Sequence, residues 1–375
     1  MTEAQTKLPA GRRAVVTELG ETPLDAVEHH LVVEAQPPPD PSTLAPTDVV
    51  LAVTSAAVGW VDLIMTSGQY QHLPSPPYTP GLEFAGEVVW TGDEVRSVVV
   101  GDRVIADGFR TGPRSGGEHR RWGGFATYAV MPAEAAVPIP DGLSDDQACS
   151  FLGSYETAYH CLVTRGRLRE GETVLVHGAS GATGLAAVHL AKVLGATVIA
   201  TGRTPEKLEV VRAQGADHVI RTVDEDGSPK RFREEVKEIT GGRKVDVVYD
   251  GVGGDVSIES LRCVRFGARF LIVGWASTPF VARGKGRRGA PNANVLPTNL
   301  IMMKGLDVLG CPTVITTKRD PGIREERLAR LIGWAESGAL KPHVSATYGL
   351  SEVVEAMEAK WRSRHVGGVV LHPAE

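Results

Sequence analysis

One segment constrains the fold of this chain more than any other, the glycine-rich stretch HGASGATGLAAVHLAK at residues 177–192. It follows the apolar run Thr173–Val176, and its glycines stand three residues apart. A strand that runs through such a turn into a helix directs backbone N–H groups and the helix dipole at one point, which suits a pyrophosphate. The turn therefore predicts a dinucleotide site. The residues expected to form it are Gly178, Gly181, Ala182, Thr183 and Gly184.

The stretch after the next apolar run indicates which dinucleotide binds. An NAD site carries an acid about 20 residues after the turn, where it bonds the ribose hydroxyls. Here Gly202 and Arg203 stand in that place, and Lys207 follows one helical turn later. The missing carboxylate and the added cations favour a 2′-phosphate, hence NADP(H), and Arg221 after the third strand adds another cation. The alternative is that these cations are solvated charges on a helix face.

The hydrophobic pattern divides the chain into a part rich in short β-like runs and a part in which strands alternate with helices. Residues 14–137 hold short β-like runs punctuated by Gly, Pro and Asp. From the glycine turn onward strands alternate with helices, which predicts an α/β fold with a parallel sheet. An amphipathic helix is expected at Arg327–Glu336. The expected domains are residues 1–149, 150–313 and 314–375.

Composition excludes several classes of function. The chain has 375 residues and a net charge of −5, which argues against non-specific binding to nucleic acid. No uncharged apolar run approaches the length of about 18 residues that crosses a membrane, and the N-terminal residues lack the apolar core of a signal peptide. The four cysteines are scattered, so neither a disulfide framework nor a structural zinc site is expected. A cytoplasmic protein acting on a small molecule fits these features.

Segments along nearly the whole chain carry a resemblance to a known family, and five of them are given as examples. They are VGWVDLIMTSGQY, YTPGLEFAGEVV, GETVLVHGASGATG, VDVVYDGVGGD and the C-terminal GGVVL. The chain resembles the medium-chain dehydrogenase/reductase superfamily, and within it the zinc-free, zeta-crystallin-like quinone oxidoreductases and related enoyl reductases. The resemblance implies a GroES-like β-rich domain, an inserted Rossmann domain with a doubly wound parallel sheet, and a return to the first domain. It also implies a homodimer.

The resemblance bears on zinc as well. At the positions where the zinc alcohol dehydrogenases of this superfamily have their catalytic ligands, this chain has Gly59, Leu82 and Gly153, none of which can bind zinc. A metal-independent enzyme is therefore expected. Without zinc to polarise a carbonyl, simple alcohol oxidation loses its electrophile, and the expected reactions deliver hydride to an acceptor that conjugation already makes electron-poor, such as a quinone, an enone or an enoyl thioester.

The resemblance also names candidate site residues. Tyr70, in the triplet Gly-Gln-Tyr, matches a proton donor proposed for enoyl reductases, and it could equally pack under a loop. Asp62 matches an acid of both branches, with a structural or a catalytic role. Thr157 matches a threonine that lies against the nicotinamide. Further cofactor contacts are implied for Val252, Val273 and Gly274.

Some residues depart from the family pattern and weaken the assignment to quinones. Gly59 replaces a frequent Asn and Ile64 a frequent Tyr, so two polar groups are missing from the expected pocket. Thr222 replaces a Tyr near the adenosine phosphate, and Gly368 replaces a Lys in the closing strand. The acceptor therefore does not follow from the resemblance.

Two basic, glycine-rich loops, residues 110–124 and 282–294, stand out in an acidic chain. They could receive an anionic substrate such as an acyl-CoA phosphate tail, or they could be solvated, mobile loops. Three hypotheses follow: an NADPH-dependent reductase of quinones or other activated double bonds, an enoyl- or acryloyl-CoA-type reductase, and a weakly catalytic NADPH-binding protein with a structural role.

Overall fold

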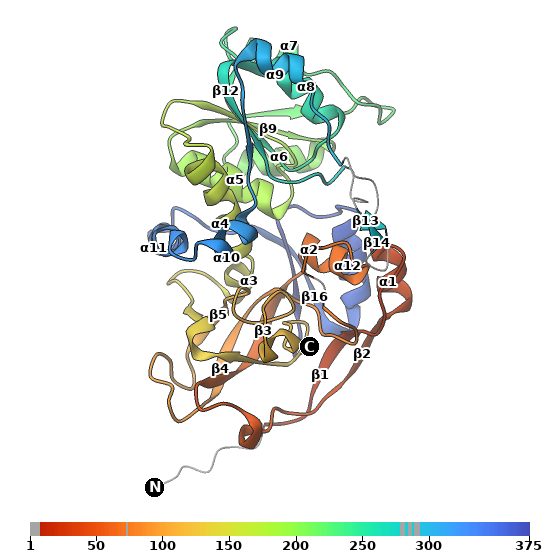
Figure 1. The fold of residues 1–375 in the computed structure, drawn as a ribbon, viewed down its shortest axis with the longest axis vertical. Helices are drawn as coiled ribbons and strands as arrows, with labels where there is room; N and C mark the ends of the chain where they lie inside the picture. Colours follow the sequence, from red (N-terminus) through yellow and green to blue (C-terminus); the bar gives the residue numbers. More distant parts are fainter. Residues whose placement is uncertain (1–7, 73, 278–281, 284–286, 289–292) are drawn as a thin grey trace.

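The computed structural model describes residues 8–72, 74–277, 282–283, 287–288 and 293–375. Two sheets stand one above the other in Figure 1, and helices lie around and between them. The upper sheet belongs to the middle of the chain, and the lower sheet combines strands from the first part with strands near the C-terminus.

The upper sheet has six strands in the order β10-β9-β8-β11-β12-β15, all parallel. The strand order reverses between β8 and β11, which is the switch point where ligands bind in open α/β sheets. The predicted doubly wound parallel sheet is therefore confirmed. Its strands are β8 (Thr173–Val176), β9 (Thr197–Gly202), β10 (His218–Arg221), β11 (Val245–Asp250), β12 (Val264–Ile272) and β15 (Asp307–Gly310).

Helices cover both faces of this sheet (Figure 1). Buried side chains of β8, β9 and β11 alternate between two hydrophobic cores, one on each face. This double burial explains why these strands read as continuous apolar runs. The helices are α5 (Ala182–Val193), α6 (Pro205–Ala213), α7 (Arg233–Ile239), α8 (Asp255–Cys263) and α9 (Thr298–Lys304).

The lower sheet has the order β16-β17-β3-β4-β5-β7, with β6 pairing with β3 as well. Strand β17 pairs with β3 through Val370 opposite Ala57, so the C-terminal segment lies in the same sheet as the first part of the chain. The expected GroES-like β-rich domain is confirmed. Its strands are β3 (Asp48–Ala57), β4 (Glu83–Thr91), β5 (Arg103–Ala106), β6 (Tyr128–Pro132), β7 (Ala136–Pro138), β16 (Val344–Gly349) and β17 (Gly368–His372).

A separate two-stranded antiparallel sheet, formed by the first two strands of the chain, and the remaining helices and turns complete the fold. Helices α2 and α12 lie side by side near the junction of the two sheets (Figure 1). The remaining elements are β1 (Gly11–Val16), α1 (Pro23–His29), β2 (Leu31–Gln36), α2 (Trp60–Thr66), α3 (Asp145–Cys149), α4 (Leu152–Tyr159), the π-helical turn η4 (His160–Arg165), the short pair β13 (Ala282–Arg283) and β14 (Arg287–Arg288), α10 (Thr313–Arg319), α11 (Ile323–Glu336) and α12 (Val353–Trp361), together with the 3₁₀ turns η1 (Pro41–Thr43), η2 (Glu118–Arg121), η3 (Ala133–Ala135) and η5 (Leu350–Glu352).

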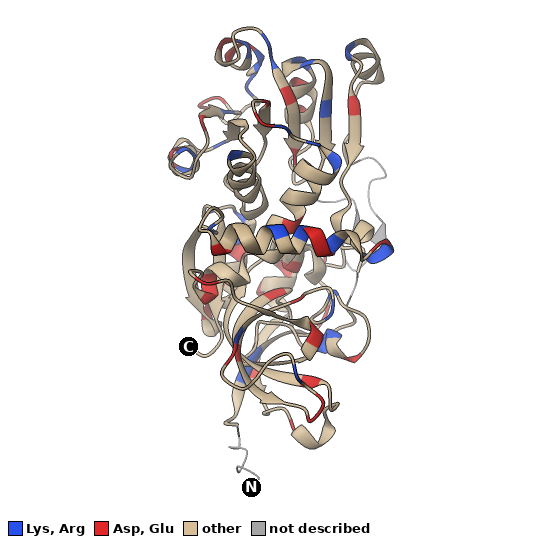
Figure 2. Ribbon diagram, turned by 90° about the vertical axis from the view of Figure 1, so that its left-hand side faces the viewer, with Lys and Arg blue, Asp and Glu red and all other residues tan. Residues whose placement is uncertain are grey.

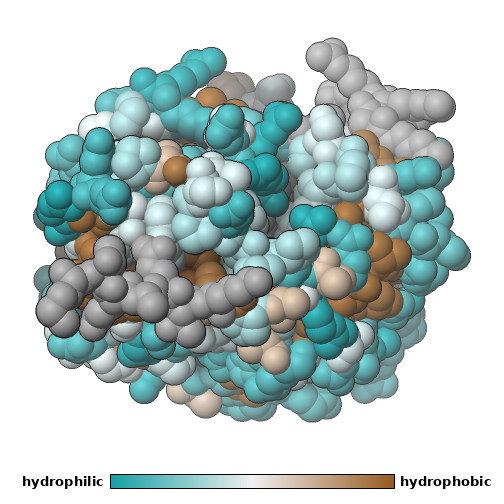
Figure 3. Space-filling model, turned by 90° about the horizontal axis from the view of Figure 1, so that it is seen from below, coloured by the Kyte–Doolittle hydropathy of each residue, from teal (hydrophilic) through white to brown (hydrophobic). Residues whose placement is uncertain are grey.

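The lower end of the molecule has a predominantly polar surface (Figure 3). Viewed from the lower end, hydrophilic residues cover most of the molecule and hydrophobic residues form separate patches (Figure 3). Within the described part of the chain, no helix has both the length and the apolar character needed to cross a bilayer.

A buried ion-pair network joins three elements that the sequence pattern did not connect. Helix α11, which crosses the front of Figure 2 with charges of both signs, begins before the expected Arg327, and its first turn contributes Arg324. The Arg324 guanidinium donates to Glu156 of α4, with Nη2 to Oε1 at 2.7 Å, and to Asp107 after β5 at 2.5 Å. Arg327 lies 2.7 Å from the other oxygen of Glu156. All four side chains are at least nine-tenths buried.

We predict that Glu156→Gln lowers the free energy of unfolding by about 3–5 kcal/mol, because it leaves the buried Arg327 without a carboxylate partner and leaves Arg324 with Asp107 alone. The control is Glu326→Gln on the exposed face of α11, whose pair with Arg330 is solvent-exposed at 3.3 Å. This control is expected to change stability by at most about 0.5 kcal/mol. Chemical denaturation of both variants measures the difference, and equal effects would contradict the prediction.

Candidate functional site

The glycine turn connects β8 to α5 in the predicted way. Gly178 has a φ of +64°, which favours glycine. A Cβ on Gly184 would overlap the carbonyl oxygen of Gly178, so only glycine lets α5 begin this close to the strand. A Cβ on Gly181 would meet only that same oxygen, at 3.4 Å. Space inside the protein therefore does not require glycine at 181, and the open backbone there is available to a ligand.

The last part of the chain approaches this turn from the other domain. Gly367 N donates to Ser180 O at 2.9 Å, and Gly181 and Gly367 form an isolated parallel bridge. The loop before β17 thus lies against the turn. The predicted phosphate site is at a seam between the two domains.

The cations predicted for the 2′-phosphate gather at the end of β9. Arg203 is exposed, and its carbonyl oxygen accepts a hydrogen bond from Arg221 Nε at 3.2 Å. Burial, with the neighbouring charge of Arg203, lowers the pKa of Lys207. The Lys207 ammonium donates to Ser363 O, a contact with the C-terminal segment that the sequence did not predict. Arg221 therefore supports the loop, and Arg203 is the exposed cation of the three.

Asp250 brings the ends of β11 and β12 together at the same edge. Its Oδ1 accepts from Val252 N at 2.9 Å, and its carbonyl oxygen accepts from Val273 N at 2.9 Å and from Gly274 N at 3.2 Å. The Val252 side chain would lie 3.1 Å from a Cβ on Gly178. The residues predicted to contact the cofactor after these strands thus line the edge where the glycine turn lies.

Asp62 uses its oxygen atoms to hold the backbone in place. It is 2 % exposed, and its carboxylate accepts from Gly59 N at 3.1 Å and from Gly81 N and Leu82 N at 3.0 Å each. Burial raises the pKa of Asp62 to about 6, while these hydrogen bonds act in the opposite direction. These contacts fix the start of α2 to the segment before β4.

Tyr70 lies in the turn after α2 and is half-buried. Its ring contacts that of His72 edge-on, with centroids 5.7 Å apart. Thr157 lies on α4, where its hydroxyl donates to Gly153 O at 2.8 Å. The contacts of Tyr70 and Thr157 would therefore also be expected if these side chains had only a structural role.

The three positions at which the resemblance located zinc ligands meet in space. A Cβ on Gly59 would lie 2.7 Å from Asp62 Oδ2, and a Cβ on Gly153 would overlap Glu83 Oε1. Leu82 lies between them, because its N–H donates to Asp62 and Glu83 follows it in the chain. The three positions surround two carboxylates and bring no ligand atom of their own. Among the described residues, no group of three or more His, Cys, Asp or Glu side chains could hold a metal ion.

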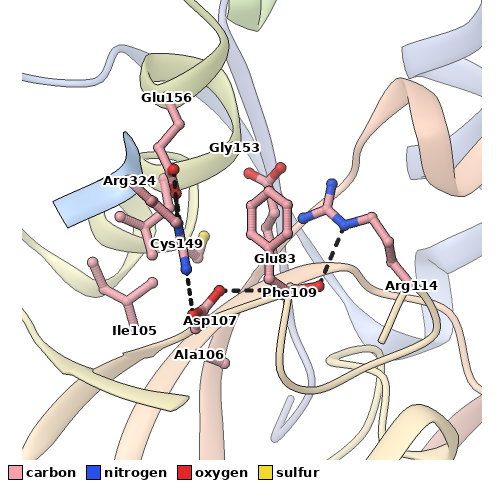
Figure 4. A pocket seen from close by; sticks show the side chains of 12 residues that line it. Glu83, Ile105, Ala106, Asp107, Phe109, Arg114, Cys149, Gly153, Glu156 and Arg324 are labelled. Carbon is pink, nitrogen blue, oxygen red and sulfur yellow. Dashed lines mark hydrogen bonds and ion pairs between the residues drawn. The ribbon is translucent and has the colours of Figure 1, made fainter. Parts of the chain in front are cut away.

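Glu83 and Arg114 are charged residues of this site that sequence reasoning missed. Burial raises the pKa of Glu83 to about 7, and the charges of Arg114 and Lys360 oppose that shift. Arg114 is 7 % exposed, stacks over the Phe109 ring at 4.9 Å and lies beside Glu83 (Figure 4). The cavity that these residues line has a volume of about 10 Å³, which holds one water molecule at most. A space of this size is too small to hold a substrate.

The first basic loop, residues 110–124, is more ordered than a solvated loop. Besides the buried Arg114, His119 Nε2 lies 2.9 Å from Asp48 Oδ1, and the Arg121 guanidinium lies over the Trp122 ring. Most of the second loop, residues 282–294, lies outside the described residues. Of its described part, Asn294 accepts from Gly254 N at 3.2 Å.

Comparison with known proteins agrees with this geometry. Residues 45–141 match the family model of the alcohol dehydrogenase GroES-like domain, and residues 182–317 match the zinc-binding dehydrogenase model. A quinone oxidoreductase-like protein 2 homolog of Nematostella vectensis is 34% identical over 372 residues, which cover 98% of this chain and 91% of the relative.

Solved structures give the same result. The quinone oxidoreductase of Pseudomonas syringae is 26% identical with a TM-score of 0.74, and the match covers 97% of this chain and 100% of that one. A mycobacterial protein solved in complex with NADPH is 27% identical with a TM-score of 0.75, over 97% of this chain and 100% of that one. The resemblance found in the sequence is thus confirmed, and the chain belongs to the medium-chain dehydrogenase/reductase superfamily, among its quinone oxidoreductase-like proteins.

Proposed function

We propose that this protein is an NADPH-dependent, metal-independent oxidoreductase that delivers hydride to a quinone or another α,β-unsaturated acceptor. The observation that carries the proposal is the meeting of Gly59, Leu82 and Gly153 around Asp62 and Glu83 without a single ligand side chain among the three. The matched family description speaks of zinc-binding dehydrogenases, and these residues do not fit that chemistry.

The acceptor class follows from this missing electrophile. When bound, NADPH supplies a hydride, and the protein must orient it and stabilise the charge that develops on the acceptor. In the zinc enzymes a Lewis acid stabilises that charge on a simple alcohol or ketone, whereas a conjugated acceptor spreads it over its own π-system. The residues present here therefore favour quinones, enones and enoyl thioesters.

The choice of NADP(H) is supported by the exposed Arg203, with Lys207 beside it and no acid at the end of β9. The similar mycobacterial structure contains NADPH. We propose that Arg203 meets the 2′-phosphate directly, and that Lys207, already bonded to Ser363 O, links this end of the cofactor site to the C-terminal segment.

The roles of the two residues that the resemblance named differ. With three backbone N–H groups on its carboxylate, Asp62 is proposed as a positioning residue for α2. Tyr70 stays the proton donor that the resemblance names. Val252, Val273, Gly274 and Thr157 are proposed as contacts to the nicotinamide half of the cofactor.

An enoyl- or acryloyl-CoA-type reductase is the second candidate. The observation that favours it is the pair of exposed arginines Arg120 and Arg121 in the first basic loop, which could meet an anionic tail. A weakly catalytic NADPH-binding protein is the third candidate, favoured by the absence of polar side chains at Gly59 and Ile64.

The assembly and location that we propose are a homodimer in the cytoplasm. Strand β15 is at the edge of the parallel sheet, and Phe266, Met302 and Met303 near it are each more than 60 % exposed. Such an apolar edge suits a second copy of the chain. The four cysteines are free, which suits a reducing compartment.

We expect Gly184→Ala to weaken NADPH binding at least tenfold, because its Cβ would push α5 away from Gly178 and open the turn. Gly333→Ala in α11 is the control, since a Cβ there meets nothing within 4 Å. Fluorescence titration with NADPH measures both dissociation constants. Wild-type affinity in Gly184→Ala would show that the turn does not hold the cofactor.

Wild-type protein is expected to bind NADPH at least tenfold more tightly than NADH, and Arg203→Asp to remove or reverse that preference. The reason is that a carboxylate repels the 2′-phosphate and can bond free ribose hydroxyls. Arg212→Ser, an exposed arginine on α6 paired with Glu209, controls for loss of surface charge. Calorimetry measures the dissociation constants for NADPH and NADH. An unchanged preference for NADPH in Arg203→Asp would contradict the assignment of Arg203 to the 2′-phosphate.

A survey of acceptors tests the function itself. NADPH oxidation with 1,4-benzoquinone or a simple enone, at a rate unaffected by a metal chelator, is the expected result. Turnover of crotonyl-CoA alone would favour the second candidate. Tight binding of NADPH without turnover of any acceptor would favour the third and overturn the proposal.

A further inference from the structure

His177 is a buried histidine, 1 % exposed, that stands directly before the first glycine of the turn. Its imidazole forms two short contacts inside the protein. Nδ1 lies 2.7 Å from Thr201 Oγ1 near the end of β9, and Nε2 lies 2.6 Å from Ser260 Oγ on α8. Its backbone N–H donates to Tyr249 O of β11 at 3.0 Å. One residue thus connects the start of the glycine turn with three other elements.

The position of the imidazole proton follows from the bonds of Ser260. The Ser260 hydroxyl donates to Val256 O at 2.7 Å, so it has no second proton to give, and its oxygen accepts a hydrogen bond from His177 Nε2–H. Burial lowers the pKa of His177 to about 4, which keeps the imidazole neutral near pH 7. Nδ1 of the neutral ring is then an acceptor, and the Thr201 hydroxyl donates to it. A single tautomer therefore satisfies both ring nitrogens.

The bond to Thr201 leads to the end of the site that is proposed to hold the 2′-phosphate. Thr201 is 1 % exposed, and its carbonyl oxygen accepts from Ala179 N of the glycine turn at 3.2 Å. Arg203, the exposed cation of this site, follows two positions later. The side-chain bond of His177 and the backbone bond of Ala179 therefore both hold the end of β9 against the glycine turn.

The bond to Ser260 leads to the opposite end of the site. Ser257 and Ser260 are both fully buried and lie three positions apart, on one face of α8. The Ser257 hydroxyl donates to Asp250 Oδ2, and Oδ1 of the same carboxylate accepts from Val252 N at 2.9 Å. Because Val252 is one of the proposed contacts to the nicotinamide half, helix α8 connects His177 to that half of the cofactor.

We propose that His177 is a positioning residue of the cofactor site, and that its two hydrogen bonds set the two ends of the dinucleotide separately. Through Thr201 it places Arg203 for the 2′-phosphate and contributes to the preference for NADPH over NADH. Through Ser260 it places the turn of Val252, and with it the nicotinamide, for hydride transfer. The inference rests on the proposed function and deepens it. It concerns the placement of the cofactor and adds no proton-transfer step.

Two variants each remove one of these bonds with little change in side-chain shape. Thr201→Val is expected to weaken NADPH binding about fivefold or more and NADH binding less than about twofold, because only NADPH carries the phosphate that Arg203 meets. Ser260→Ala is expected to lower kcat about tenfold or more, because a small misplacement of the nicotinamide is costly in rate, while both dissociation constants change less than about twofold. Calorimetry and steady-state kinetics measure these effects.

His189 on α5 provides a matched control. Its Nδ1 lies 2.7 Å from Tyr155 OH and its Nε2 lies 3.2 Å from Gln214 Oε1, and burial lowers its pKa to about 4, as for His177. His177→Leu and His189→Leu each remove two hydrogen bonds from the same domain, so both are expected to lower the free energy of unfolding. Only His177→Leu is expected to lower the preference for NADPH and kcat. If His177→Leu does not fold, Thr201→Val and Ser260→Ala carry the test.

A spectroscopic measurement needs neither cofactor nor turnover. In free protein labelled with ¹⁵N at histidine, the shifts of the ring nitrogens distinguish the two neutral tautomers from the imidazolium, and His177→Gln assigns the signal. Wild type is expected to show the Nε2–H tautomer of His177 at neutral pH. Ser260→Ala removes the acceptor of Nε2–H and is expected to shift the proton towards Nδ1, where Thr201 Oγ1 accepts it. Thr201→Val is expected to keep the Nε2–H tautomer.

The outcomes separate the proposals. Equal losses of NADPH and NADH affinity in Thr201→Val, or an unchanged kcat in Ser260→Ala, would make His177 a structural residue and overturn the inference. An imidazolium or an Nδ1–H tautomer in wild type would overturn it as well. Wild-type protein that binds NADPH but turns over no acceptor would remove the proposed function. In that case the emission of bound NADPH, which comes from the nicotinamide, replaces kcat as the measurement, and no change in Ser260→Ala would overturn the inference.

Discussion

The close contact between Gly184 and the carbonyl oxygen of Gly178 is the constraint on which the site depends. It sets how near α5 begins to β8, and therefore where the free N–H groups of its first turn point. The same turn contacts Gly367 through Ser180, so its position also fixes the seam with the other domain. One steric requirement thus shapes both the proposed phosphate site and the domain junction.

The distribution of charge around that seam is unusual for a buried region. Glu83, Arg114 and Lys360 all lose water contacts, and the shifts in the pKa of Glu83 and Lys360 record the cost. Next to them, Asp107, Glu156, Arg324 and Arg327 form a network in which the ionic groups pair closely. The network is paired and holds α4, α11 and the loop after β5 together, whereas the Glu83 carboxylate forms no hydrogen bond or ion pair with the described residues.

Local sequence was sufficient for features that depend on neighbouring residues. The strand, turn and helix around Gly181 and the cations at the end of β9 could be read from spacing alone, and the resemblance supplied the order of the domains. It could not supply the contacts of Lys207 with Ser363 or of Lys360 with Gly367, because these join residues far apart in the chain through side chains that look like ordinary solvated cations in the sequence. Arg114 differs in nothing local from Arg110, yet one is buried and the other is exposed. Arg114 packs on the Phe109 ring and donates to Gly108 O, whereas Arg110 pairs with Asp107 and Glu134.

A crystal structure with NADP⁺ would show directly whether the dinucleotide lies along the seam between the glycine turn and the C-terminal segment. We expect the diphosphate at the start of α5, the 2′-phosphate within hydrogen-bonding distance of Arg203, and the nicotinamide ring near Thr157. A dinucleotide whose phosphates lie away from Gly181, or whose 2′-phosphate points into solvent away from Arg203, would contradict it.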